Sequence, residues 1–267
     1  MTAPFDPARL RILNYNTHVG VTIRGALRFL LDTHDPHLVV LQEVQSPRAR
    51  LAARVVLPPH IWSAVGTRPA STGRGSAGTL LFARRSALEL AGSSNELVTP
   101  FRDRFHPERR CTTGRYVHRA TGQVLDIGAV HLWTLAGSAA APAIRAAHLT
   151  QLRAHAGSAR RARSAGRLPF RIGDFNEHIS GGGGSPAERE LATADLRPAR
   201  PAGDHTGRLD EIFVPREIAC HDYRAITLPS HFPGVEGPHK ALVVDVTIPP
   251  RSHPARPVHA GHRAGRG

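Results

Sequence analysis

The sequence has few cysteines and no long apolar run, and each shortage excludes a class of protein. Its 267 residues include two cysteines, Cys111 and Cys220, so a disulfide scaffold is excluded and we expect two unpaired thiols. The longest strongly apolar run, Leu38–Leu41, is far shorter than the ~20 residues of a membrane-spanning helix. The first 13 residues are charged and have no apolar core, so we expect no export signal and a cytoplasmic protein.

Lysine is almost absent, and arginine supplies nearly all of the positive charge. The chain has 35 Lys and Arg against 21 Asp and Glu, a net charge of +14, and Lys240 is its one lysine. The planar guanidinium binds phosphate well, which favours a polyanionic partner such as nucleic acid. A GC-rich codon pool would produce the same arginine excess together with frequent alanine and proline. Charge alone does not distinguish these two explanations.

Short aliphatic runs separated by polar loops predict a mixed α/β protein with more strands than helices. We expect strands at residues 10–15, 38–41, 79–83, 124–132, 170–172, 209–214 and 241–248. Helical patterns cover residues 23–31 and 142–155, and Ser185 to Glu188 resembles a capping box that begins a short helix. We expect a short extension at residues 1–8, one domain at 9–249 and a disordered tail at 250–267, where four arginines occur without an acid.

Polar side chains recur where the predicted strands meet loops. Asp174 and Asn176 end one strand, and because they are two residues apart they share a face. Carboxylate and amide oxygens are ligands that a hard divalent cation prefers. Five other candidates lie at strand ends or just before strands: Asn16, Glu43, His131, Asp210 and His239. Together these positions predict a pocket at one edge of a sheet.

In this order and spacing, the motifs resemble those of the endonuclease/exonuclease/phosphatase superfamily over about residues 10 to 248. Gly173–Asn176 reads as the family signature. The other matching segments are Leu10–Asn16, Val40–Glu43, Val130–Leu132 and Thr206–Val214. The resemblance implies a four-layer α/β sandwich of the deoxyribonuclease I type, with two mixed β-sheets packed face to face. It also implies a hydrolase of phosphoester bonds that depends on Mg²⁺ or Mn²⁺.

The resemblance assigns a role to each candidate residue. Glu43 would be the principal metal carboxylate, with Asn16 beside it or in contact with phosphate. Asp174 and Asn176 would hold the attacking water and a phosphate oxygen. The remaining assignments are His239 as the catalytic histidine, Asp210 as its orienting partner, His131 as a donor to a phosphate oxygen, and Arg110, in preference to Arg109, as the phosphate-contacting arginine.

Two departures from the family pattern concern the metal and the central histidine. The family carries an aspartate directly before its last histidine, whereas this chain has Pro238, which offers no side-chain ligand. Glu236 is the nearby carboxylate that could replace it, so the number of metals stays open. The glutamate that supports the central histidine in some nucleases has no match near Ala77 and Gly78.

The sequence therefore predicts a metal-dependent phosphoester hydrolase, with nucleic acid as the first candidate substrate. One alternative is the same fold acting on a lipid or a soluble phosphoester, since a fold does not determine its substrate. Another is a nucleic-acid-binding protein whose catalysis is weakened by Pro238. Endonuclease and exonuclease action are not distinguished, and nothing in the sequence indicates a protein partner.

Overall fold

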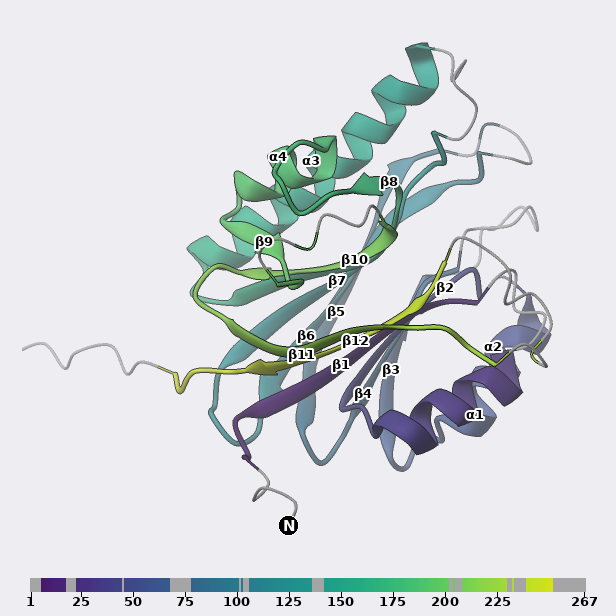
Figure 1. Ribbon diagram of the computed structural model, residues 1–267, viewed down its shortest axis with the longest axis vertical. Coiled ribbons are helices and arrows are strands. Elements are labelled where there is room, and N and C mark those ends of the chain that lie inside the picture. Colours follow the sequence, from purple (N-terminus) through teal and green to yellow (C-terminus); the bar gives the residue numbers. More distant parts are fainter. Residues whose placement is uncertain are drawn as a thin grey trace, which may run out of the picture.

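The computed structural model describes residues 6–17, 23–44, 46–67, 78–100, 102, 106–135, 142–201, 204, 208–229, 232 and 239–251. In these residues, two six-stranded sheets pack face to face with helices on both outer sides (Figure 1). The predicted four-layer α/β sandwich is confirmed. The predicted tail beyond residue 251, most of the predicted extension, Glu236 and Pro238 lie outside the described residues.

The first sheet has the strand order β11-β12-β1-β2-β4-β3. Its strands are β1 (Arg9–Asn16), β2 (Leu38–Gln42), β3 (Trp62–Gly66), β4 (Leu80–Arg84), β11 (Ala219–Ile226) and β12 (Ala241–Thr247). The neighbours β1 and β2 are parallel and the other pairs are antiparallel. A parallel pair needs a crossover, which helix α1 (Ile23–His34) provides, and α2 (Pro47–Val56) follows β2.

The second sheet repeats this plan in the order β5-β6-β7-β8-β10-β9. Its strands are β5 (Leu88–Thr99), β6 (Arg109–His118), β7 (Val124–His131), β8 (Leu168–Ile179), β9 (Leu196–Pro198) and β10 (Arg208–Pro215). Here β7 and β8 are the parallel pair, and the long helix α3 (Pro142–Ser164) is their crossover. Helix α4 (Pro186–Ala192) lies beside α3 on the same side of the sheet (Figure 1).

Three apolar layers hold the sandwich together, and strand alternation assigns side chains to them. In β1, Leu10 and Ile12 belong to the core between the sheets, whereas Leu13 and Tyr15 belong to the core under α1. A third core lies between the second sheet and helices α3 and α4. Because side chains alternate along a strand, Asn16 continues the row of Leu10 and Ile12 at the end of β1. The inter-sheet core therefore ends in polar side chains.

All seven predicted strands and all three predicted helices occur, with changed ends. The 170–172 strand is the middle of β8, and the helix predicted to 155 continues to Ser164. The Ser185 capping box is present, with both of its hydrogen bonds to Glu188. The elements that the sequence did not predict are α2, β3, β5, β6, β9 and β11. Both cysteines are unpaired as expected, and no described helix has the length and apolar character to span a membrane.

Candidate active site

Strand register places the predicted site residues side by side at one end of the sandwich. In the second sheet, Asp174 of β8 is paired with His131 of β7 on one side and with Asp210 of β10 on the other. In the first sheet, Asn16 is paired with Gln42, the residue before Glu43. The two rows meet across the inter-sheet core, because β1 and β2 contact β7 and β8.

Asp174 is the centre of the cluster and is almost completely buried. Its Oδ2 accepts hydrogen bonds from Asn16 Nδ2 at 3.1 Å and from Asn176 Nδ2 at 3.0 Å. Its Oδ1 accepts the backbone N–H of Asn176 at 2.8 Å. The same Asn16 amide donates to Glu43 Oε1 at 3.3 Å, so one side chain joins the carboxylates of both sheets.

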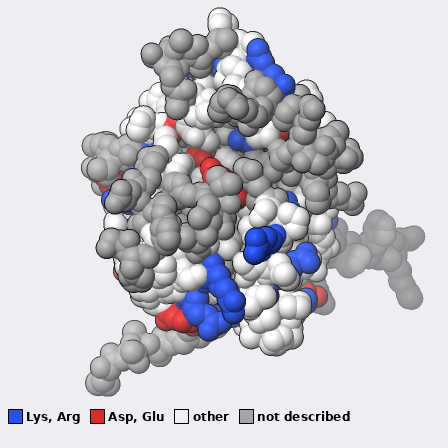
Figure 2. Space-filling model, turned by 90° about the vertical axis from the view of Figure 1, so that its right-hand side faces the viewer, with Lys and Arg blue, Asp and Glu red and all other residues white. Residues whose placement is uncertain are grey.

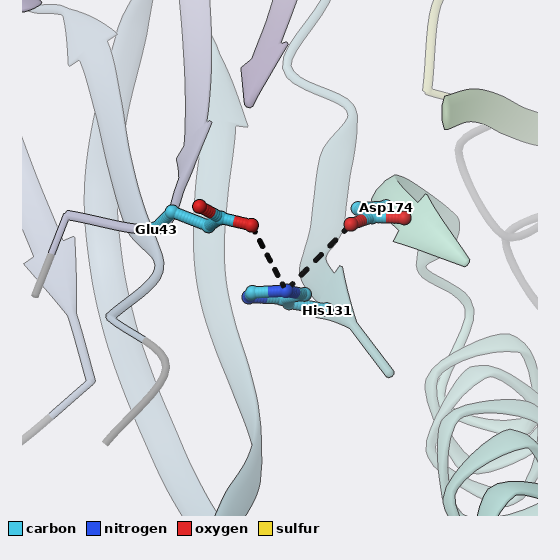
Figure 3. Close-up of side chains that lie close together, drawn as sticks. All are labelled: Glu43, His131 and Asp174. Atoms are coloured by element: carbon cyan, nitrogen blue, oxygen red, sulfur yellow. Dashed lines mark ion pairs between the residues drawn. The ribbon is translucent and has the colours of Figure 1, made fainter. Parts of the chain in front are cut away.

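Glu43 and His131 complete the side of the site shown in Figure 3. There the His131 ring lies between the two carboxylates, with Nε2 3.9 Å from Glu43 Oε1 and 3.6 Å from Asp174 Oδ2. Glu43 and Asn176 both have positive φ angles, 59° and 51°. Such angles are uncommon for residues other than glycine, and they cluster at functional sites.

Gly173 allows the signature segment Gly173–Asn176 of β8 to approach strand β7 closely. Its φ is +147°, and a Cβ at this position would lie 2.0 Å from the carbonyl oxygen of Val130 in β7. No other residue fits there without moving the strand, since glycine alone lacks the Cβ. This close approach brings the backbones of β8 and β7 together at the residue before Asp174.

His239 enters the site from the segment before β12 and is held by Asp210. His239 Nδ1 lies 2.7 Å from Asp210 Oδ2, and the same nitrogen is 4.0 Å from Asp174 Oδ2. A carboxylate accepts a hydrogen bond but cannot donate one, so Nδ1 carries a proton. The Nε2 atom is then the ring nitrogen available for chemistry.

The pKa values of His131 and His239 are shifted in opposite directions. Burial lowers the pKa of His131 far below its ordinary value, and the positive charges of Arg109 and His239 lower it further, so His131 is neutral. Burial also lowers the pKa of His239, but the hydrogen bond and charge of Asp210, with those of Asp174 and Glu43, raise it to about 9. Asp210 therefore favours the protonated form of His239. Pairs of groups whose pKa values are pushed apart are typical of acid–base sites.

The carboxylates of the site fit a divalent cation. Two overlapping groups have ligand atoms within 4.8 Å of one another, Glu43 with His131 and Asp174, and Asp174 with Asp210 and His239. Burial raises the pKa of Asp174 to about 8, and the negative charge of Asp210 contributes to this increase. A cation beside Asp174 would relieve this repulsion, and carboxylate and amide oxygens are suitable ligands for Mg²⁺ or Mn²⁺.

Of the two adjacent arginines, Arg109 is the one that interacts with the site carboxylates, so we expect it, in place of the predicted Arg110, to contact phosphate. Arg110 is held by Glu108 at 2.8 Å and by the Asn95 carbonyl at 3.3 Å, and none of its contacts among the described residues reaches the site carboxylates. The Arg109 guanidinium is buried and interacts electrostatically with Asp174 and Glu43. Adjacent strand residues point to opposite faces, so only one of the two arginines can face a given side.

Polar atoms without protein partners surround the site. Among the described residues, Nε and Nη1 of Arg109 and Nδ1 of His131 are buried and have no hydrogen-bond partner. Buried polar atoms without partners are costly, so these atoms favour a ligand that completes the site. Figure 2 shows this end of the molecule, with acidic atoms near the centre of the face.

The sequence and the fold were compared with known proteins. The model of the endonuclease/exonuclease/phosphatase family matches residues 15–232, and no curated protein matches the chain. Three solved structures have a similar fold. D. rerio TDP2 complexed with single strand DNA product is 13% identical, with 89% of this chain and 98% of that chain covered and a TM-score of 0.65. The Bacteroides thetaiotaomicron mannosyl-6-phosphatase Bt3783 is 12% identical, with 89% of this chain and 99% of that chain covered and a TM-score of 0.67. The human Nocturnin catalytic domain with bound sulfate is 18% identical, with 89% of this chain and 93% of that chain covered and a TM-score of 0.65. At these identities the likeness concerns the fold.

Proposed function

Since the chain belongs to the endonuclease/exonuclease/phosphatase family of metal-dependent phosphoester hydrolases, we propose that it cleaves phosphodiester bonds of nucleic acid, with Mg²⁺ or Mn²⁺ as cofactor. The observation that carries the proposal is the convergence of Glu43, Asp174 and the Asp210–His239 pair on one spot beside a buried arginine. That set combines cation ligands, a proton donor and a fixed positive charge, which phosphodiester hydrolysis requires together.

The residues at the centre of the site bind the cation and the water. Glu43 and Asp174, with Asn16 beside them, are the ligands that would hold a divalent cation, which supplies Lewis-acid activation of the phosphate when bound. Asn176 uses one amide hydrogen on Asp174 and the other on the Leu132 carbonyl, so its Oδ1 is left to accept a hydrogen bond from the attacking water. Asp174 is positioned to accept the second hydrogen of that water.

The charged and neutral donors around the phosphate have separate tasks. Arg109 offers its two unpartnered nitrogens to a nonbridging phosphate oxygen. Neutral His131 donates an N–H to another oxygen without adding charge. His239, an imidazolium oriented by Asp210, can pass its Nε2 proton to the departing oxygen.

Two observations support nucleic acid as the substrate. The net charge of +14 attracts a polyanion through its phosphates, and one of the similar structures, the D. rerio TDP2, holds a single strand DNA product. The mannosyl-6-phosphatase has the same fold, so a soluble phosphoester is the main competitor. Location in the cytoplasm stays a prediction.

A substrate panel with metal controls tests the proposal. Plasmid, abasic duplex, single-stranded DNA, a generic phosphodiester, sphingomyelin and inositol phosphates are each incubated with Mg²⁺ or Mn²⁺, with and without chelator. We expect cleavage of DNA that stops with chelator and falls about 10²–10⁴-fold in His239→Ala. His221→Ala is the matched control, since that histidine is exposed and bonded to Thr247. DNA cleavage that persists in chelator, or turnover of a small phosphoester alone, would contradict the proposal.

A further variant tests whether catalysis is weakened by Pro238. If the chain binds DNA but scarcely cleaves it, Pro238→Asp restores the family's carboxylate and should increase turnover at unchanged DNA affinity. Efficient cleavage by the unchanged protein excludes this alternative.

A further inference from the structure

Trp133, two residues after the end of β7, is held by three polar contacts. Its backbone N–H donates to Gln151 Oε1 at 2.9 Å, and its carbonyl accepts from His148 Nδ1 at 2.8 Å. The indole Nε1 donates to the Pro107 carbonyl at 2.7 Å. His148 and Gln151 lie on one face of α3, and both are buried. Two side chains of α3 therefore hold the backbone of a single residue.

The residue before Trp133 connects this anchor to the active site. The Leu132 carbonyl accepts Arg109 Nη2 at 3.2 Å and Asn176 Nδ2 at 2.9 Å, and the Leu132 N–H donates to the Asp174 carbonyl at 3.1 Å. The direction of the Leu132 carbonyl thus sets the directions of the Arg109 guanidinium and the Asn176 amide. The Leu132 carbonyl and the Trp133 N–H belong to one planar peptide group, so displacing Trp133 turns that carbonyl.

Both ring nitrogens of His148 have buried partners. The Trp133 carbonyl can only accept, so Nδ1 carries a hydrogen, and Nε2 lies 3.2 Å from Glu177 Oε2. The other oxygen of Glu177 accepts the Ala187 N–H at the start of α4. His148 is thus held at both ring nitrogens, by the Trp133 carbonyl and by the buried Glu177. Gln151 is fixed likewise, since its Nε2 donates to Thr99 Oγ1 at 3.0 Å.

We propose that His148 and Gln151 are positioning residues for the hydrolysis, which act by fixing Trp133 and, through the Leu132 carbonyl, orienting Arg109 and Asn176. This inference rests on the proposed function. Neither side chain touches the reacting atoms. A displacement of about 1 Å at a site of this kind can reduce the rate by ~10²-fold. His148, Gln151 and Glu177 are all buried, and a buried hydrogen-bond network of this kind is rigid, which suits a fixed anchor.

Two substitutions of His148 separate positioning from simple packing. Asn places its amide N–H where Nδ1 lies, so His148→Asn keeps the bond to the Trp133 carbonyl and loses the one to Glu177. His148→Gln places its amide near Nε2, so it keeps Glu177 and loses Trp133. We expect kcat for a generic phosphodiester to fall about 10–100-fold in His148→Gln and less than about threefold in His148→Asn. The Mg²⁺ concentration for half-maximal activity should stay unchanged in both, since neither Arg109 nor Asn176 is among the proposed metal ligands.

A second pair and a control make the result decisive. Gln151→Glu keeps the acceptor for the Trp133 N–H, whereas Gln151→Leu removes it, so we expect kcat to be lower in Gln151→Leu. His118→Gln is the control, since His118 is also buried but bonds Thr121 at the other end of β6. Equal kcat values in the two His148 variants, whether both normal or both low, would overturn the positioning role. A wild-type protein without metal-dependent hydrolysis would instead refute the proposed function.

Discussion

Arg109 is a buried cation that the protein leaves incompletely paired, and its replacement by leucine should separate activity from stability. The residue is 7% exposed, and Nη2 donates to the Leu132 carbonyl, whereas Nε and Nη1 have no partner in the described part of the chain. Burial lowers the pKa of the guanidinium to about 10, against the opposing charges of Asp174 and Glu43. The guanidinium is therefore a buried charge whose pairing among the described residues is incomplete, and an anion such as phosphate would complete it.

The two expected effects of Arg109→Leu have opposite signs. Removing one donor to a developing phosphate charge costs about 10²–10³ in kcat, or about 3–4 kcal/mol of transition-state stabilisation. Replacing an imperfectly paired buried ion by an apolar side chain of similar volume is neutral or stabilises the fold by about 1–4 kcal/mol. We therefore expect a variant that is much less active and at least as stable as the wild type.

The assay measures phosphodiester hydrolysis and thermal unfolding on the same preparations. Arg110→Leu is the matched control, since it changes the neighbouring residue, which is paired with Glu108, and we expect activity within about twofold of wild type. The reasoning is refuted if Arg109→Leu keeps more than a third of the activity, or if Arg110→Leu loses as much. A strongly destabilised Arg109→Leu would contradict the view that this cation is incompletely paired.

Three further predictions concern the fold. Gly173→Ala should lower the free energy of unfolding by about 3 kcal/mol or more in urea titrations, because its Cβ meets the Val130 carbonyl; a wild-type midpoint would contradict this. Ser185→Ala removes the cap of α4 and should cost about 1 kcal/mol, and no measurable loss would show that the cap is dispensable. Burial raises the pKa of Asp245, but the hydrogen bond and charge of Arg11 lower it overall, so its stabilisation is present above about pH 4 and is lost as pH falls through the folded-state pKa. Asp245→Asn should flatten the dependence of the unfolding free energy on pH below about 4; unchanged acid sensitivity would refute this role.

The site was predictable because its residues follow the alternation of their strands. Asn16, His131, Asp174 and Asp210 all have the parity of the apolar residues between the sheets, so the pattern that forms the core also directs them inward. The choice between adjacent arginines was not predictable, because it depends on the face of β6, a strand without a clear apolar pattern. Spacing placed His148 on one helical face, but its backbone partner is visible only in three dimensions.

Several of the missing elements were hidden by exposed positions. Strands β5 and β11 lie at sheet edges and have many exposed residues, so their sequences lack the apolar runs of central strands. Helix α2 exposes Leu51 and Val55, which blurs its amphipathic pattern. Strand β8 was predicted too short because its second half carries the polar site residues. Polar site residues within a strand therefore interrupt the apolar pattern from which the strand would be predicted.

The central claim is that carboxylates from the two sheets share one divalent cation. A crystal grown or soaked with Mn²⁺ and measured at the manganese absorption edge tests this most directly, because the anomalous peak locates the ion independently of the refined coordinates. We predict a peak within coordination distance of Glu43 in the wild-type protein and its loss in Glu43→Gln. A peak remote from Glu43, or one unchanged by the substitution, would contradict the account.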